Sequence, residues 1–273
     1  MAKTRGKQIV LQIITLIIAL LVALPLVWSF RLAITQTFST AVPLIPQKIT
    51  FSNFSRLFSA TPFLVWLINT LIFAGAVTGL NLIFAPLAGY VLARQHLPGT
   101  NIILLFIVSA WVIPWITMLI PLYVFMSKVG LVNTHTGLII PLAVNPMVVF
   151  LTRQYFLNIP EEFEEAALID GCSKVGAFLK IILPLSKPAL MIVAVITFMS
   201  TWGNFVVPLI MINSDSKQVL TVGLATLSYG GAIDWGIKAS GALFGILPML
   251  ALFVALNKYF MQGLAMRTGT EIK

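Results

Sequence analysis

The chain has 273 residues, of which 59% are hydrophobic and only 9% are charged, and its formal net charge is +9. This charged content and a mean hydropathy of +1.01 exclude an ordinary soluble domain, in which about a quarter of the residues are charged. The composition predicts an all-α polytopic membrane protein, in which each spanning helix needs about 20 apolar residues.

Six stretches of the chain are long and apolar enough to span a membrane. The first, residues 9–30, follows the basic tip "MAKTRGK". Its length exceeds the apolar core of about 7 to 15 residues in a signal peptide, so we expect an uncleaved anchor. The other five predicted spans are residues 63–92, 102–126, 137–156, 190–212 and 240–260.

The basic residues predict the orientation, because Lys and Arg near span ends are retained on the cytoplasmic side. With the N-terminus inside, eleven basic residues lie in inner segments and six in outer ones. We therefore expect both termini, and the connection at 158–186, to be cytoplasmic. We attribute the net positive charge to these cytoplasmic segments next to the membrane lipid. A nucleic-acid partner is therefore not expected.

The stretch "EEFEEAALIDG", residues 161–171, holds five of the eight acidic residues. Pro160 suits the first position of a helix, and the four glutamates that follow favour its positive end. Gly171 is expected to end this helix in a left-handed turn. A second short helix, about 173–182, should then stop at Pro184.

Both predicted helices have an apolar face. In the first, two alanines allow a close approach, and the second carries an apolar stripe at helical spacing. The face of the first helix consists of Phe163, Ala166, Ala167 and Asp170. The stripe of the second consists of Val175, Phe178, Leu179 and Ile182. Either this loop lies on its own bundle with its acids solvated, or it docks a basic protein partner, because anionic lipid repels acids on this side.

An uncharged polar stripe runs along the predicted fifth span. Thr197, Ser200, Thr201 and Asn204 recur at helical spacing, with Trp202 beside them as a possible stacking surface. Lipid disfavours such a face, so it should point inward, where it either lines a solute path or bonds neighbouring helices. Asn69, Asn81 and Asn145 are interpreted as helix-contact groups.

The chain offers little chemistry of its own. No acidic residue falls within the six predicted spans, and no G-x-x-x-x-G-K-[ST] phosphate-binding loop is present. His96, His135 and Cys172 lack neighbours at metal-ligand spacing, so no metal site is expected. These features favour a transport subunit that is not an enzyme, although a self-sufficient channel or a membrane-embedded enzyme is an alternative.

The acidic loop resembles the E-A-A…G…I-x-L-P signature of ABC importer permeases. The matching positions, in order and spacing, are Glu165, Ala166, Ala167, Gly171, Ile181, Leu183 and Pro184. The stretches "NTLIFA", "LAGYVLAR", "GLVNTHTGLIIP" and "TVGLA" are similar to the carbohydrate-uptake, maltose-type branch of the family. In one departure, "STWGNFVVPL" has Gly203 and Asn204 where the family usually shows Asn and an acid.

The resemblance implies a type I importer fold with six transmembrane helices and a cytoplasmic helix-turn-helix between the fourth and fifth. It implies a first anchor at 1–32, an extracytoplasmic cap segment at 33–62, a permease core at 63–262 with its coupling loop at 158–186, and a tail at 263–273. Glu165 and Asp170 would meet groups of an ATPase subunit, and Gly171 would set the angle between the helices.

The resemblance also implies the partners and the solute. The implied partners are a second permease subunit that forms a heterodimer with this chain, two cytoplasmic ABC ATPase subunits that bind ATP and Mg, and an extracytoplasmic solute-binding protein. The implied location is the inner membrane. The implied solute is a sugar or oligosaccharide, with another polar solute as the alternative.

Overall fold

The computed structural model describes residues 2–35, 48–95, 97–227 and 233–268, and the described residues form helices and turns, with one isolated bridge between Thr35 and Ile49. The predicted all-α class is therefore confirmed. Two compact units make up the chain: Met1–Leu64 with Gly223–Leu247, and Val65–Val222 with Pro248–Lys273. His96 lies outside the described residues.

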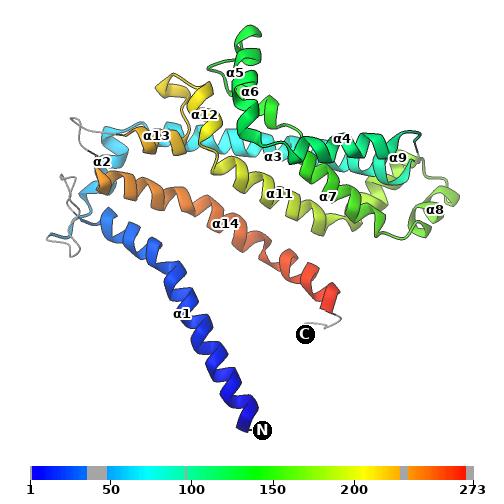
Figure 1. Cartoon of the computed structure of the whole chain (residues 1–273), viewed down its shortest axis with the longest axis horizontal. Helices are drawn as coiled ribbons and strands as arrows, with labels where there is room; N and C mark the ends of the chain where they lie inside the picture. Colours follow the sequence, from blue (N-terminus) through cyan, green and yellow to red (C-terminus); the bar gives the residue numbers. More distant parts are fainter. Residues whose placement is uncertain (1, 36–47, 96, 228–232, 269–273) are drawn as a thin grey trace. The chain divides into compact units, whose positions relative to one another are not determined.

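Figure 1 shows the helices of the described residues, coloured in chain order. Their bounds are α1 (Ala2–Ala33), α2 (Ser52–Ala60), α3 (Phe63–Arg94), α4 (Thr100–Val112), η1 (Trp115–Met118), α5 (Leu119–Lys128), α6 (His135–Ile139), η2 (Ile140–Leu142), α7 (Pro146–Leu157), α8 (Glu162–Ile169), α9 (Lys174–Ala177), η3 (Phe178–Ile182), α10 (Leu183–Leu185), α11 (Lys187–Trp202), α12 (Val206–Met211), η4 (Asp215–Lys217), α13 (Leu220–Thr226) and α14 (Trp235–Thr268).

Three helices of the described chain are long and apolar enough to cross a membrane: α1 from Lys7, α3, and α14 as far as Ala255. Three bent pairs also qualify if each counts as one span: α4 with η1 and α5, bent by 92°, α6–η2 with α7, bent by 41°, and the α9–α10 stretch with α11, bent by 74°. The total of up to six agrees with the predicted number of spans.

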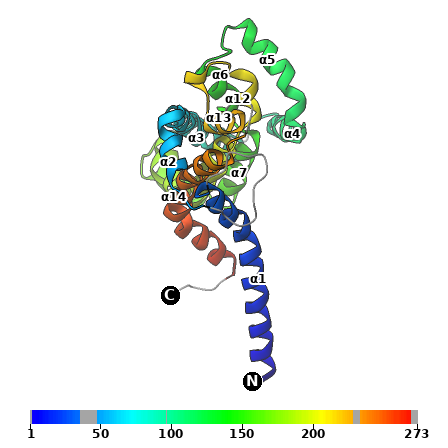
Figure 2. The ribbon, with the colours of Figure 1, turned by 90° about the vertical axis from the view of Figure 1, so that its left-hand side faces the viewer.

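Prolines account for two of the three bends. Ile113 precedes Pro114 and adopts an extended backbone conformation (φ −62°, ψ 125°), which ends α4. Asn145 precedes Pro146 in the same way (φ −97°, ψ 120°), and its side chain caps α7 by accepting from the Met147 amide. Figure 2 shows how sharply α5 departs from α4.

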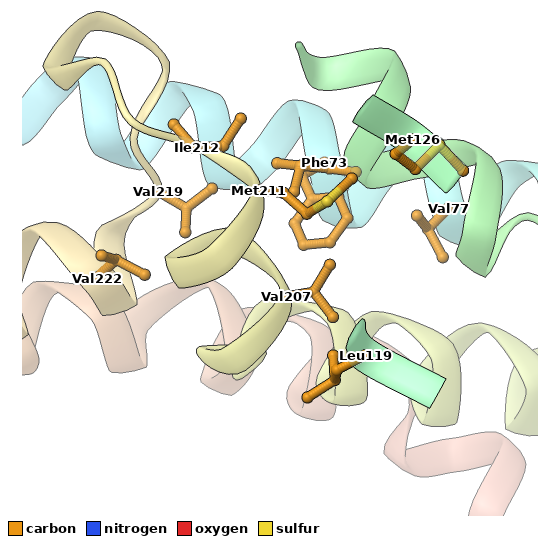
Figure 3. Packing of buried hydrophobic residues seen from close by; sticks show 10 residues of the cluster. Phe73, Val77, Leu119, Met126, Val207, Met211, Ile212, Val219 and Val222 are labelled. Carbon is orange, nitrogen blue, oxygen red and sulfur yellow. The ribbon is translucent and has the colours of Figure 1, made fainter. Parts of the chain in front are cut away.

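The second unit has an apolar core around the first half of α3. Phe73 and Val77 of α3 pack with Val207 and Met211 of α12, and with residues of α5 and α13 (Figure 3).

Hydrogen bonds also join α3 to the segment around η4, because Asn69 donates to the carbonyls of Ser216 (3.0 Å) and Gln218 (2.9 Å). The helix-contact interpretation of Asn69 therefore holds.

The first unit is organised around α2. Asn53 is buried and donates to the carbonyls of Ala33 (2.9 Å) and Thr35 (2.8 Å), which joins α2 to the end of α1. Arg56 pairs with the buried Asp234 at 2.7 Å. The predicted cap segment thus contains an ordered amphipathic helix, while residues 36–47 lie outside the described part.

Two predicted helix ends differ from the structure. The fifth span is interrupted, because α11 ends at Trp202 and a turn through Gly203 leads to α12. The second loop helix ends one residue after the expected stop at Pro184, at Leu185, where the chain bends by 74° into α11. The preceding turn, η3, is a π-helix, and its wider i→i+5 pattern accommodates a proline that lacks an N–H donor.

Candidate functional site: the coupling segment and an uncharged cavity

The coupling segment, residues 158–186, forms the helix-turn-helix that the sequence predicts. Helix α8 ends near Asp170, and Gly171 takes a left-handed conformation with φ +85°. Ser173 then starts α9, since its hydroxyl accepts from the Gly176 amide at 3.1 Å. In Figure 1, α8 and α9 lie at the same end of the second unit as the ends of α3 and α7.

One face of the coupling segment is open to solvent and mixes acids with apolar side chains. Glu165, Ala166, Asp170 and Gly171 are all exposed. Ile169 between them is 86% exposed, which is unusual for a large apolar residue in a solvated loop. Phe163, Val175, Leu168 and Leu179 are exposed as well. A patch of this composition suits a protein contact.

The opposite face packs on the bundle. Ala167, Ala177, Phe178 and Ile182 are buried, and the last two join a cluster with Tyr90, Phe156 and Ile159. The stripe predicted for the second helix is therefore divided, with Phe178 and Ile182 inside and Val175 and Leu179 outside. Of the remaining signature residues, Ile181 and Leu183 are half-buried and Pro184 is exposed.

Two of the acids in α8 and its cap are paired with residues of α3. Glu161 accepts from Arg94 Nη1 at 2.9 Å, and Glu164 lies 3.7 Å from Arg94 Nε and accepts from the Tyr90 hydroxyl. The sequence reasoning missed Tyr90 and Arg94, which both belong to the "LAGYVLAR" stretch. A basic residue at the end of a predicted span was the available signal, but it did not indicate which acids would meet it.

A cavity of about 650 Å³ opens within the second unit, between α3, α4, η1, α5, η2, α7 and α11. Of the described residues that line it, none is charged. The polar ones are Asn81, Asn145, Thr197, Ser200, Thr201 and Asn204, and the aromatic ones are Trp111, Trp115 and Phe125. Its volume falls within the range of about 300 to 1,000 Å³ that is usual for small-molecule sites.

All four residues of the predicted polar stripe line this cavity. Thr197 and Ser200 donate to carbonyls of their own helix, at 2.6 and 3.0 Å, and their oxygens keep lone pairs that can accept from a solute. Asn204 lies in the turn after α11, so it reaches the cavity from a position off the helix. Trp202 is not a lining residue: it is buried and stacks on Phe198, with ring centroids 5.5 Å apart.

The cavity also contains residues that sequence reasoning assigned differently or did not single out. Asn81 does connect helices, since it donates to Leu142 O and accepts from the Asn145 amide, yet both asparagines also line the cavity. Trp111 and Trp115 were not singled out. They flank the break at Pro114. A proline inside a predicted span was the sequence feature that could have indicated this break.

The arrangement supports binding and contains no recognisable reaction centre. Within the described ranges, no group of three or more His, Cys, Asp or Glu is placed to hold a metal ion. The cavity offers hydroxyls, amides and flat indole faces, which recognise neutral polar molecules by hydrogen bonds and stacking.

Comparison with known proteins agrees with the geometry. The profile of the family described as "Binding-protein-dependent transport system inner membrane component" matches residues 1–265. The arabinooligosaccharides transport system permease protein AraQ of Halalkalibacterium halodurans is 36% identical over 239 residues, which cover 86% of this chain and 85% of that protein. The trehalose/maltose transport system permease protein MalG of Thermococcus litoralis is 29% identical, with 94% and 95% covered.

A solved structure is similar over nearly the whole chain. It is the crystal structure of a bacterial ABC transporter involved in the import of the acidic polysaccharide alginate, with a TM-score of 0.81, 25% identity, and 94% of this chain and 97% of that chain covered. Together with the family match, this likeness rules out the alternatives of a self-sufficient channel and a membrane-embedded enzyme. The chain belongs to the family of binding-protein-dependent transport system inner membrane components and is a permease subunit of an ABC importer.

Proposed function

We propose that this permease subunit forms half of the path for a neutral sugar or oligosaccharide, and that its coupling segment docks on an ATPase subunit. We infer the class of solute from the uncharged cavity, which is lined by hydroxyl, amide and indole groups. A sugar presents many hydroxyls and flat apolar ring faces, which match these groups. The named relatives AraQ and MalG, whose names state sugar transport, support the same class.

The absence of charge among the described lining residues distinguishes neutral from acidic sugars. A carboxylate in a membrane cavity needs a basic partner, because an isolated charge there is costly. The described residues of this subunit place none at the cavity. The solute is therefore proposed to be neutral, unlike the acidic polysaccharide named for the alginate importer.

The coupling segment supports the proposed partners. Its open face combines Glu165 and Asp170 with the exposed Ile169, which suits a cleft with basic and apolar groups on an ATPase subunit. The exposed Ala166 permits a partner to approach closely, and the buried Ala167 lets α8 pack closely on its own bundle, while Ile181, Leu183 and Pro184 shape the return to α11. The complete assembly is proposed to contain a second, different permease subunit, two ATPase subunits that bind ATP and Mg, and a solute-binding protein.

Solute-stimulated ATP hydrolysis by the complete complex in lipid tests the proposal. With the solute-binding protein present, a neutral oligosaccharide of arabinose or glucose should stimulate hydrolysis and be taken up. A uronic-acid oligosaccharide of equal length is the matched control, and it should do neither. Stimulation by the acidic sugar alone would contradict the proposed solute class.

We further propose that both termini and the coupling segment face the cytosol. Single cysteines at Lys3, Ser173 and Thr270, introduced after replacement of Cys172, should be protected from an impermeant thiol reagent in intact cells. A cysteine at Lys128 is the control and should react, because the predicted orientation places it outside. Labelling of the Ser173 position from outside would overturn this orientation.

A further inference from the structure

Arg94 lies at the end of α3 and binds several parts of the coupling region at once. Its guanidinium donates to the carbonyls of Phe156 (3.0 Å) and Ile159, and it pairs with Glu161 and Glu164. Tyr90, one turn earlier on α3, donates its hydroxyl to Glu164. We name Tyr90, Arg94, Glu161 and Glu164 the Arg94 cluster.

The Arg94 cluster differs from an ordinary surface ion pair because it is largely shielded from water. The Arg94 side chain is only 4% exposed and that of Glu164 only 12%, whereas that of Glu161 is 58% exposed. Exposed pairs contribute little to stability, but breaking a buried pair leaves an uncompensated charge. The Glu164 contacts should therefore hold α8 firmly in one orientation.

Aromatic packing extends this connection to the second helix of the coupling segment. The Tyr90 ring lies 4.6 Å from that of Phe178 and 6.2 Å from that of Phe156, measured between centroids. One side chain of α3 thus contacts α8 through its hydroxyl, and η3 and α7 through its ring. Both halves of the coupling segment are attached to the same turn of α3.

The same helix reaches the cavity. Asn81 and Val77 of α3 line it, and the 13 residues from Asn81 to Arg94 span about 20 Å of continuous helix. The intervening part is held against α7, because the Thr152 hydroxyl donates to the Ala85 carbonyl at 2.9 Å. A continuous helix with one part in the coupling region and another in the cavity wall is suited to carry a movement between them.

Building on the proposed function, we propose that Tyr90 and Arg94 are positioning residues that transmit movement between the coupling segment and the cavity wall. They act through Glu164, which fixes α8 to α3, so that a shift of the docked helix moves α3 as well. In this arrangement the acids of α8 have two separate tasks. Glu165 and Asp170 face the ATPase, while Glu161 and Glu164 hold the helix to its own subunit.

The test is a double-mutant cycle on Tyr90→Phe and Glu164→Leu in the reconstituted complex, measured as solute transported per ATP hydrolysed. Tyr90→Phe should lower this ratio by about tenfold, the effect of losing one hydrogen bond to a charged group, and Glu164→Leu, which also removes the contact with Arg94, by at least as much. The double variant should fall no further than the more affected single variant, because both changes remove the same bond. The amount of ATPase subunit that co-purifies should stay the same.

Tyr155→Phe is the matched control. It removes the same atom from a tyrosine whose hydroxyl donates to Leu185 O at 3.4 Å, a longer bond to an uncharged acceptor in the same segment. Its ratio should change by less than about twofold. Losses that multiply in the double variant, or an unchanged ratio in both single variants, would overturn the positioning role. If instead the unmodified complex shows no solute-stimulated hydrolysis, the proposed function itself is contradicted.

Discussion

The coupling segment and the cavity belong to the same compact unit and contain opposite kinds of polar residue. Five of the eight acidic residues lie in 161–171, whereas the described lining of the cavity has hydroxyls and amides but no charge. The acids are solvated or paired at one end of the unit. The neutral groups face a space between helices that the membrane would surround.

The difference follows from the cost of charge in each place. At an exposed interface, charged groups retain much of their hydration until a partner binds, and they then provide selectivity for that partner. Within the membrane a charge is costly unless it is paired, so a path for a neutral solute is better formed from uncharged groups. Changes in the two regions should therefore have separable effects.

Glu165→Lys should have the largest effect, because it reverses the charge at the centre of the open face. Removing one partner of a desolvated charged contact costs about 2 to 5 kcal/mol, and the like charge adds repulsion. We expect most of the ATPase subunit to be lost on purification. Asp215→Lys makes the same change at an exposed acid outside the coupling segment and should leave the yield unchanged. Equal yields for both variants would contradict the docking role.

Gly171→Val should have a smaller effect, which acts through the backbone. No atom lies within 4 Å of an added Cβ, so the change does not produce a clash. A side chain at φ +85° nevertheless adds about 1 to 2 kcal/mol of strain and tilts α9 relative to α8. The subunits should stay associated while transport per ATP falls.

Gly75→Val is the control for Gly171→Val, because Gly75 also has free space around it but has an ordinary helical backbone. It should leave the transport ratio near that of the unmodified complex. A similar fall in both variants would mean that the left-handed turn is not the cause.

Asn204→Leu should lower transport severalfold without loss of the ATPase subunit, since it removes a hydrogen-bonding group worth about 1 kcal/mol from the cavity. Asn204 also accepts from the Val207 amide at 3.2 Å, so local structure is a competing explanation. Ser200→Leu distinguishes a lost solute contact from a local structural effect, because its hydroxyl donates to the Thr197 carbonyl of its own helix α11. Met199→Leu, on the same helix and not among the lining residues, should transport normally. Normal transport by both cavity variants would make the stripe structural.

Local sequence signals predicted the elements whose causes are local. The six spans depend on long apolar runs, and the turn at Gly171 depends on a glycine that follows an acid-capped helix. The polar stripe was also predictable, since Thr197, Ser200 and Thr201 recur at helical spacing. Each of these features is determined by residues close together in the chain.

The features that were not predicted depend on contacts between residues far apart in the chain, on side-chain stacking, or on a local change in helix type. Arg94 meets Glu161 and Glu164 from 67 and 70 positions away, so the sequence did not show which acids would turn inward. Trp202 was expected beside the solute path, but stacking on Phe198 keeps it buried. Pro184 was expected to end a helix, and the helix ends one residue later, at Leu185, after a π-helical turn that the sequence did not indicate.

We propose that docking and solute passage depend on separate regions of this subunit. This proposal is tested most directly by preparing Glu165→Lys and Ser200→Leu complexes side by side, and by measuring the ratio of ATPase subunit to permease and the rate of solute uptake in each. We predict a low ATPase ratio for Glu165→Lys, and a normal ratio with reduced uptake for Ser200→Leu. The same pattern of loss in both variants, or ATPase loss only in Ser200→Leu, would contradict the account.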